Sequence, residues 1–294
     1  MLRSMIPLGL APAPSGRIYR RSPALPADRA ARLRGQLPLP LLIASRLVRA
    51  AARDRVVTGP FCGMKVSASA LSRHHLASYL LGTYELELRP VLSRIIARRY
   101  GTILNLGAAD GYYAVGLALR SRCVHIEAFE GRPEFHPLIR RAVRRNRVSD
   151  RIRLNGKCTA DALRHRLESA VLPALLLVDA VDETDLVDLR SAPELRCTDI
   201  LAEAPEWHLA DALIDRFWRT HNVECYTAQL RILADFPTTL LPALRRWFPR
   251  LAVDLMDEQR GGIQHWLFLT AKSEVGSGGF DSRDLMPVAE GASG

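Results

Sequence analysis

The sequence predicts an α/β fold, a Rossmann-like, doubly wound and mostly parallel seven-stranded sheet with a terminal antiparallel strand pair. Three observations predict it. Between residues 101 and 220, short apolar runs alternate with segments of helical periodicity. A glycine turn at 107–111 joins the first apolar run to the helix that follows it. Near the end of the chain, residues 223–229 and 263–271 alternate in the manner of antiparallel strands.

The other elements follow in order along the chain. Apolar residues recur at helical spacing over 69–100, where Pro90 marks a helix start or kink. We then expect strands at 102–106, 124–129, 152–154, 175–179 and 199–203, with helices at 112–118, 133–146 and 209–220. The strand at 175–179 is almost wholly apolar, as expected for a strand covered on both faces. An insert at 230–262, which contains proline and arginine, separates the last two strands.

Four segments divide the 294 residues of the chain. Residues 1–36 are rich in Pro, Arg and Ala without periodicity, which predicts a disordered leader. They weakly resemble a mitochondrial transit peptide, and a mis-called start codon explains them equally well. We expect residues 37–100 to form a helical lead-in, 101–272 the Rossmann-like domain and 273–294 a disordered tail.

The net charge of +10 is unevenly distributed along the chain. Residues 1–60 contain eleven Arg and two Asp, and the rest of the chain is close to neutral. Only three of the 41 basic residues are Lys, a bias that GC-rich coding produces without selection for phosphate contacts. We therefore expect a small-molecule substrate rather than a nucleic acid. The apolar stretch 37–48 is too short to span a membrane, and the oligomeric state stays open.

Cysteine and histidine usage indicates neither a disulfide framework nor a metal site. The five cysteines are widely spread and never form a Cys-x-x-Cys pair, which fits a reducing, cytoplasmic setting. The eight histidines show no His-Glu-x-x-His or mixed Cys/His cluster. We therefore predict no protein-bound metal.

The glycine turn and an acid after the second strand are the strongest functional signals. Gly107 and Gly111 frame a bend where a ligand can approach backbone amides at a helix N-terminus. A third glycine at the dinucleotide-fingerprint spacing is missing, so a plain strand-to-helix turn is the alternative. Glu130 follows the second strand, where a carboxylate can accept hydrogen bonds from both ribose hydroxyls of a nucleoside. Its alternative role is to cap the following helix.

Together with their neighbours, these residues carry a family resemblance. The first motif is NLGAADGYY at 105–113, and the second is AFEGRP at 128–133. Further matches lie at 59–64, 82–85, Asn146, 156–163 and the acidic strand end at Asp179. Over residues 56–272 the chain resembles the FkbM-like class I methyltransferases, which use S-adenosylmethionine.

The resemblance implies an activity and a set of site residues. The activity is O-methylation of a small molecule or a sugar hydroxyl, with S-adenosylmethionine as cofactor. Glu130 would hold the ribose, and Tyr84 and Glu85 would lie near the cofactor's carboxylate or amine end. Asp179 would face the reaction centre, with Asp182 as a second catalytic candidate. The implied cofactor-binding set is Tyr84, Glu85, Asn105, Gly107, Ala109, Asp110, Gly111, Glu130, Cys158 and Asp179.

Departures from the family pattern leave alternatives open. The family's Ile-Glu-Gly-Ala-Glu run after the fourth strand is replaced by the glycine-free 179–185, DAVDETD. In one interpretation, Asp182 and Asp185 substitute for those acids. In the other, the protein is a catalytically eroded relative that binds S-adenosylmethionine as a scaffold. A nicotinamide-dependent oxidoreductase is disfavoured by the missing third glycine. His208 and His221 are candidate bases, or else surface or core residues.

Overall fold

The computed structural model describes residues 10–12, 18–20, 38–67, 74–122, 124–179, 186–188, 190–258 and 264–272. Within the leader, two short strands, β1 (Leu10–Pro12) and β2 (Ile18–Arg20), pair in antiparallel fashion. The rest of the predicted leader and the predicted tail lie outside the described residues. No helix in the described part of the chain is long and apolar enough to cross a bilayer.

The main sheet has seven strands, in the order β5-β4-β3-β6-β7-β9-β8. The parallel strands are β3 (Thr102–Leu106), β4 (His125–Phe129), β5 (Ile152–Asn155), β6 (Ala174–Val178) and β7 (Thr198–Ala204). The antiparallel pair is β8 (His221–Thr227) and β9 (His265–Ala271). The predicted Rossmann-like class and the terminal antiparallel pair are thereby confirmed.

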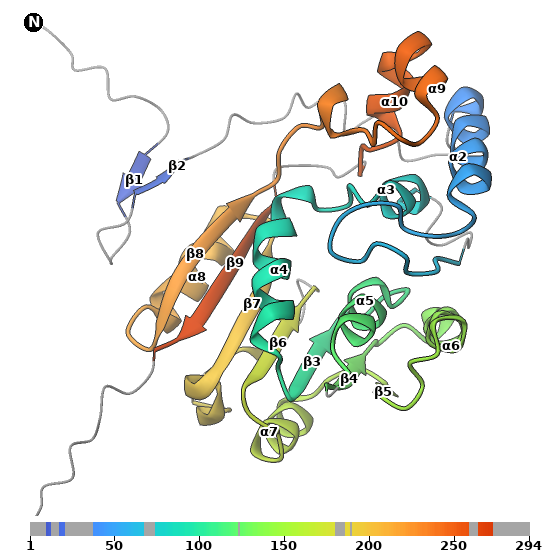
Figure 1. Cartoon of the computed structure of the whole chain (residues 1–294). Helices are drawn as coiled ribbons and strands as arrows, with labels where there is room; N and C mark the ends of the chain where they lie inside the picture. The colour runs from blue at the N-terminus through green and yellow to red at the C-terminus, as the bar shows by residue number, and fades with distance from the viewer. Residues whose placement is uncertain are drawn as a thin grey trace, which may run out of the picture.

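Helices cover both faces of this sheet (Figure 1). They are α2 (Leu39–Ala52), α3 (Leu76–Leu81), α4 (Arg89–Arg98), α5 (Tyr112–Arg120), α6 (His136–Asn146), α7 (Ala160–Glu168), α8 (Trp207–Phe217), α9 (Pro242–Trp247) and α10 (Pro249–Asp254). Short 3-10 turns lie at η1 (Leu86–Leu88), η2 (Pro133–Phe135), η4 (Pro193–Cys197) and η5 (Leu233–Asp235). The insert therefore holds α9 and α10, which lie beside α2 although far from it in sequence (Figure 1).

The core consists of two apolar layers separated by the sheet. β6 shows how one strand serves both, because successive side chains point to opposite faces. Leu175 and Leu177 pack in the layer with α4, α5 and α6, whereas Leu176 and Val178 pack in the layer with α7 and α8. All four are fully buried. This confirms the expectation that this almost wholly apolar strand is covered on both faces.

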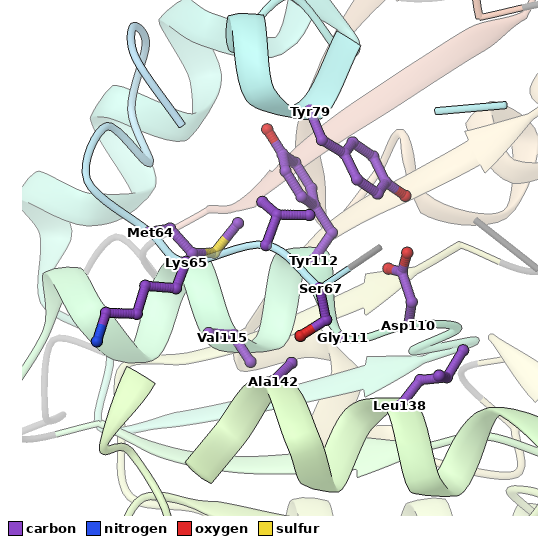
Figure 2. A pocket seen from close by; sticks show the side chains of 11 residues that line it. Met64, Lys65, Ser67, Tyr79, Asp110, Gly111, Tyr112, Val115, Leu138 and Ala142 are labelled. Carbon is purple, nitrogen blue, oxygen red and sulfur yellow. The ribbon is translucent and has the colours of Figure 1, made fainter. Parts of the chain in front are cut away.

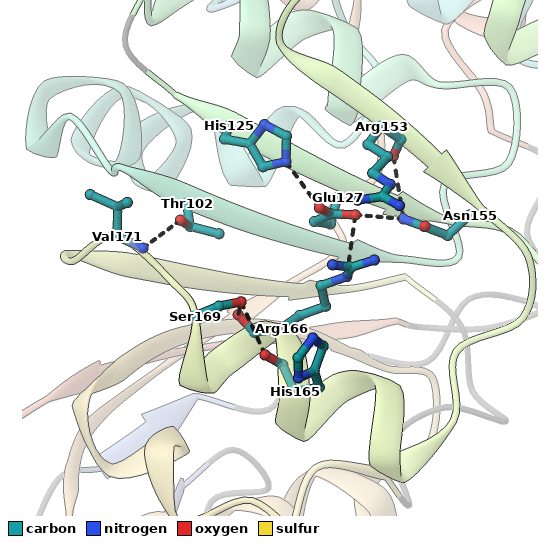
Figure 3. A network of polar contacts seen from close by, with 9 residues as sticks. All are labelled: Thr102, His125, Glu127, Arg153, Asn155, His165, Arg166, Ser169 and Val171. Atoms are coloured by element: carbon teal, nitrogen blue, oxygen red, sulfur yellow. Dashed lines mark hydrogen bonds and ion pairs between the residues drawn. The ribbon is translucent and has the colours of Figure 1, made fainter.

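A polar network ties β4 to β5 and α7 (Figure 3). Glu127 is 4% exposed, and its carboxylate lies 2.9 Å from His125 Nε2 and accepts a 2.7 Å hydrogen bond from Asn155. Arg166 of α7 adds an ion pair at 3.6 Å. Burial raises the pKa of Glu127, but the contacts with His125 and Asn155 outweigh it and hold the pKa below its ordinary value. The network fixes the strand whose end carries Glu130.

Candidate functional site

The turn between β3 and α5 is held tightly against the neighbouring strand. Ala108 N donates to Phe129 O at 2.8 Å, and Gly111 N donates to Ala108 O at 2.7 Å. Gly107 and Gly111 have φ of 74° and 88°, and Ala109 has φ of 46°. Residues with a Cβ rarely adopt this left-handed backbone conformation, so glycine at two of the three positions favours the bend. The turn presents backbone amides at the N-terminus of α5.

Glu130 meets this turn directly. It is 2% exposed, and its Oε2 accepts a 2.7 Å hydrogen bond from Ala109 N. Its Oε1 accepts hydrogen bonds from the backbone N and from Nε of Arg132, at 2.9 and 2.8 Å. Burial raises the pKa of Glu130, but Arg132 and the Ala109 amide outweigh it and hold the pKa below the ordinary value. The carboxylate is therefore charged and oriented at neutral pH.

A cavity of about 430 Å³ opens beside the turn. Its described lining is His75, Tyr79, Tyr84, Ala108, Ala109, Asp110, Tyr112, Tyr113, Arg132, Phe135, Asp179, Glu203, Glu258 and Gln264. Most of these residues follow β3, β4 and β6, end β7, or precede the antiparallel β9, and the others come from α3 and its flanking turns or from the insert. The cavity thus lies at the carboxyl edge of the parallel strands, where open α/β sheets bind ligands.

A smaller hollow lies next to the cavity (Figure 2). Its lining comes from the 64–67 segment and from α3, α5 and α6. Tyr79, Asp110 and Tyr112 line both spaces, so the two are neighbours. Gly111 faces the smaller one.

Tyrosine rings form one wall of the cavity. Tyr79 and Tyr112 stack with their centroids 4.2 Å apart, and Tyr84 meets Tyr79 edge-on at 4.6 Å. Burial raises the pKa of Tyr79 and of Tyr112 well above the ordinary value, and nearby carboxylates raise both further. These phenols therefore stay neutral, and their ring faces can attract a cationic ligand.

Carboxylates form another wall. Glu85, Asp179 and Glu203 come from three separate elements, yet each offers an oxygen within 4.8 Å of the other two. Asp179 N donates to Leu106 O at 2.9 Å, which places the end of β6 beside the end of β3. The insert contributes Glu258, whose Oε1 accepts a 2.7 Å hydrogen bond from Glu85 N.

The structure places the predicted site residues at different distances from this cavity. Tyr84, Ala109, Asp110 and Asp179 line it, and Glu85 touches it through the carboxylate cluster. Gly107 lies in the turn, and Glu130 lies against it. Asn105, 1% exposed within β3, and Cys158, 2% exposed before α7, are core residues, and neither is among the described lining.

The remaining candidates lie away from the cavity lining or outside the described residues. Asp182 and Asp185 lie outside the described residues. His208 is exposed and pairs with Glu206 at 3.2 Å. His221 is 1% exposed, its Nε2 lies 2.9 Å from Thr198 O, and burial lowers its pKa, so it is a neutral core residue.

Sequence reasoning missed several residues of the cavity. Glu203 was recognised only as a strand end, although an acid at the carboxyl edge of a parallel strand is itself a signal. Glu258 and Gln264 belong to the insert and its junction with β9, where no motif marks them. Arg132 was visible in the second motif without a role.

The fold defines a Rossmann-like α/β protein with a candidate nucleoside site. No protein-family model matches the chain, and no curated protein matches it in sequence. Among solved structures, it is similar to the C-terminal domain of precorrin-6Y C5,15-methyltransferase from Rhodobacter capsulatus, with 14% identity, TM-score 0.42, and coverage of 63% of this chain and 87% of that one.

Two further solved structures are similar over most of the chain. One is an O-methyltransferase from Bacillus cereus in complex with SAH, with 13% identity, TM-score 0.39, and coverage of 83% of this chain and 96% of that one. The other is the O-methyltransferase TomG from Streptomyces achromogenes in complex with SAM, with 12% identity, TM-score 0.37, and coverage of 82% and 94%. At such identities and TM-scores, the function of this chain has to be argued from its own site.

Proposed function

We propose that this protein is a class I methyltransferase of the FkbM-like kind, which uses S-adenosylmethionine to methylate a hydroxyl of a small molecule or sugar. The observation that carries the proposal is the 2.7 Å hydrogen bond from Ala109 N to Glu130 Oε2. It joins the left-handed turn after β3 to the acid after β4, the two places that a nucleoside-binding α/β protein uses. The two family motifs at 105–113 and 128–133 therefore act as one unit.

The residues present fit the cofactor by size and by charge. A cavity of about 430 Å³ falls within the usual range of small-molecule sites. Its carboxylates and neutral tyrosine faces suit a ligand with a positively charged sulfur and an ammonium group. Arg132 is the one lysine or arginine in the described lining, and it is engaged by Glu130.

Each part of the site has a role in this account. Glu130 accepts hydrogen bonds from the ribose hydroxyls. These hydrogen bonds replace the ones that the Arg132 side chain donates to Glu130. The turn at 107–111 approaches the methionine part, and Tyr84 and Glu85 lie toward its amine. The cofactor supplies a methyl group on a sulfonium, and the protein holds the acceptor oxygen in line with it. Asp179 and Glu203 line the same cavity, and either carboxylate would accept the proton that leaves the hydroxyl.

The partner and the setting remain expectations from the sequence. We expect a small-molecule acceptor, a cytoplasmic protein and no nucleic-acid partner. The cavity supports the first of these, because its volume of about 430 Å³ suits a small ligand and its lining is rich in carboxylates, which repel phosphate backbones.

Calorimetric titration of the full chain with S-adenosylhomocysteine and, separately, with NADH tests the proposal. We expect the homocysteine nucleoside to bind at one site per chain and NADH not to bind, because the turn lacks the third glycine of a dinucleotide site. Binding of NADH without binding of the homocysteine nucleoside would contradict the proposal.

The altered 179–185 run favours a second candidate, a relative that binds the cofactor without turnover. Incubation with cofactor labelled in the methyl group and a small-molecule cell extract separates the two. Label transfer that Asp179→Ala abolishes supports the enzyme. Cofactor binding without any transfer supports the scaffold.

A further inference from the structure

We propose that Glu85, Asp179 and Glu203 bind a divalent cation that prefers oxygen ligands, of the Mg²⁺ or Mn²⁺ type. The three carboxylates come from the turn after α3, the end of β6 and the end of β7. No local spacing in the sequence joins them, which is why sequence reasoning predicted no metal. A set of carboxylate oxygens selects hard cations over zinc or copper.

The separation of the three groups suits a shared ion. Their oxygens lie within 4.8 Å of one another. Oxygens on opposite sides of a bound Mg²⁺ or Ca²⁺ are about 4 to 5 Å apart, so a single ion can contact all three after small side-chain adjustments. Glu85 and Glu203 are 0% and 8% exposed, so water screens their mutual repulsion poorly.

A second, independent observation concerns the polar atoms around the cluster. Tyr113 is 4% exposed and lines the same cavity as Asp179 and Glu203. Its hydroxyl has no hydrogen-bond partner among the described residues, and the same holds for the buried Oε1 of Gln264. The Gln264 amide oxygen can only accept a hydrogen bond, whereas the Tyr113 hydroxyl can donate or accept one. Water bound to a cation supplies donors to both atoms.

The protein scaffold holds the cluster in place. Glu85 has φ of 45°, a strained conformation for this residue type, and its amide donates to Glu258. Glu258 in turn pairs with Arg231 at 2.5 Å. Glu258 thus orients Glu85, in the way that neighbouring residues orient the ligands of metal sites.

The catalytic role of the cation rests on the proposed function. A cation beside the acceptor lowers the pKa of the hydroxyl that binds to it. Each carboxylate offers one oxygen to the cation, and the hydroxyl proton passes to the other oxygen of Asp179 or Glu203. The acceptor oxygen then forms a bond to the methyl carbon as the carbon–sulfur bond breaks, and the sulfur keeps the electron pair as a neutral thioether. The acceptor is therefore an alcohol or phenol whose oxygen can approach the cation.

Titration of the full chain with Mn²⁺, followed by the loss of the free-ion electron paramagnetic resonance signal, tests the site. We expect one bound Mn²⁺ per chain, displaced by Mg²⁺, and binding that is weaker by about tenfold or more in Glu203→Gln. Glu206→Gln is the matched control, because Glu206 lies just past the same strand with a side chain 70% exposed, and it should bind Mn²⁺ like the wild type. Asp179→Asn gives a second test if Glu203→Gln does not fold.

Absence of Mn²⁺ binding by the folded wild type, or equal binding by Glu203→Gln and wild type, would overturn the cation site. Titration with S-adenosylhomocysteine in EDTA separates this result from the proposed function. Nucleoside binding without Mn²⁺ binding removes the cation and leaves the methyltransferase. Mn²⁺ binding without nucleoside binding leaves the cation site and removes the methyltransferase.

Discussion

At the scale of single residues, the Glu130 carboxylate is held by two backbone amides, those of Ala109 and Arg132, and by the exposed Arg132 side chain. The Ala109 amide belongs to the turn, whereas the Arg132 side chain is 56% exposed. Ion pairs with an exposed partner contribute about 0 to 1 kcal/mol, so a nucleoside can displace this guanidinium at little cost. The contact with the Ala109 amide stays in place and orients the carboxylate.

Glu130→Gln should weaken the binding of S-adenosylhomocysteine by about tenfold to a hundredfold. The physical reason is that hydrogen bonds to a charged group contribute about 1.5 to 3 kcal/mol, and an amide offers one acceptor where the carboxylate offers two. Calorimetric titration measures the change. Glu134→Gln is the control, because Glu134 is exposed on η2 and outside the cavity lining. Unchanged affinity in Glu130→Gln would exclude Glu130 as the ribose ligand.

Glu127→Gln should lower the free energy of unfolding at pH 7 by about 1 to 3 kcal/mol. The pKa of Glu127 is depressed in the folded protein, so its network stabilises the fold above the unfolded carboxyl pKa of about 4.3. That contribution is lost as the pH falls through the folded pKa. Urea unfolding from pH 7 to pH 3 should therefore show a shallower loss of stability in the variant than in the wild type. Parallel curves for the two proteins would contradict the role of the network.

At the scale of elements, the turn after α3 depends on Gly82. Its φ is 71°, and an added Cβ would lie 2.1 Å from Thr58 O. The turn positions Tyr84 and Glu85 beside the cavity. A glycine here is required both for the left-handed backbone and for the close approach of another segment.

Gly82→Ala should destabilise the protein considerably more than Gly63→Ala. Both glycines have positive φ, but nothing lies within 4 Å of a Cβ at Gly63. Gly63→Ala therefore measures the cost of the left-handed backbone alone, about 1 to 2 kcal/mol. Gly82→Ala adds the clash with backbone. Equal midpoints of urea unfolding for the two variants would show that the close packing at Gly82 is wrong.

Periodicity predicted the parallel strands because their apolar runs are strong local signals. The run at 175–179 is an example, since every residue of the observed strand β6 is buried. Helix α7 was not predicted, although Thr159 caps it by accepting a 3.2 Å hydrogen bond from Ala162 N. Its exposed face is mostly charged, so its apolar stripe is short. The helix start or kink predicted at Pro90 is confirmed, because α4 begins at Arg89 and carries Pro90 in its first turn. The turn before it depends on the tertiary contacts of Gly82, which no local pattern predicts.

At the scale of the whole molecule, a buried ion-pair network docks the insert onto the lead-in helices. Arg231, 7% exposed, pairs with Glu87 at 3.0 Å and with Glu258 at 2.5 Å. Glu258 reaches the cavity wall and accepts from Glu85 N. One arginine thus links segments far apart in the chain to the candidate site.

Arg231→Met should lower the free energy of unfolding by about 3 to 5 kcal/mol, because it removes the cation shared by two buried carboxylates. Arg250→Met is the matched control, since Arg250 is exposed on α10 in the same insert. It should change stability by no more than about 0.5 kcal/mol. Chemical unfolding of both variants measures the difference. A loss of similar size in both would mean that the network does not dock the insert.

The site could be predicted in part, because two of its components are short local motifs. The turn at 107–111 and Glu130 are each visible in sequence, and the carboxyl edge of a parallel sheet brings such positions together. Glu203 and Glu258 join the site only through tertiary structure, since one ends a different strand and the other comes from an insert without a motif. Whether Asp182 belongs to the site stays a prediction, because it lies outside the described residues.

A crystal structure of the full chain grown with S-adenosylhomocysteine measures the shared cavity most directly. The account predicts both ribose hydroxyls on the Glu130 carboxylate, the Arg132 side chain turned away, and the thioether sulfur in the cavity that faces Asp179. Ligand density elsewhere on the chain, with Glu130 and Arg132 still paired, would contradict it.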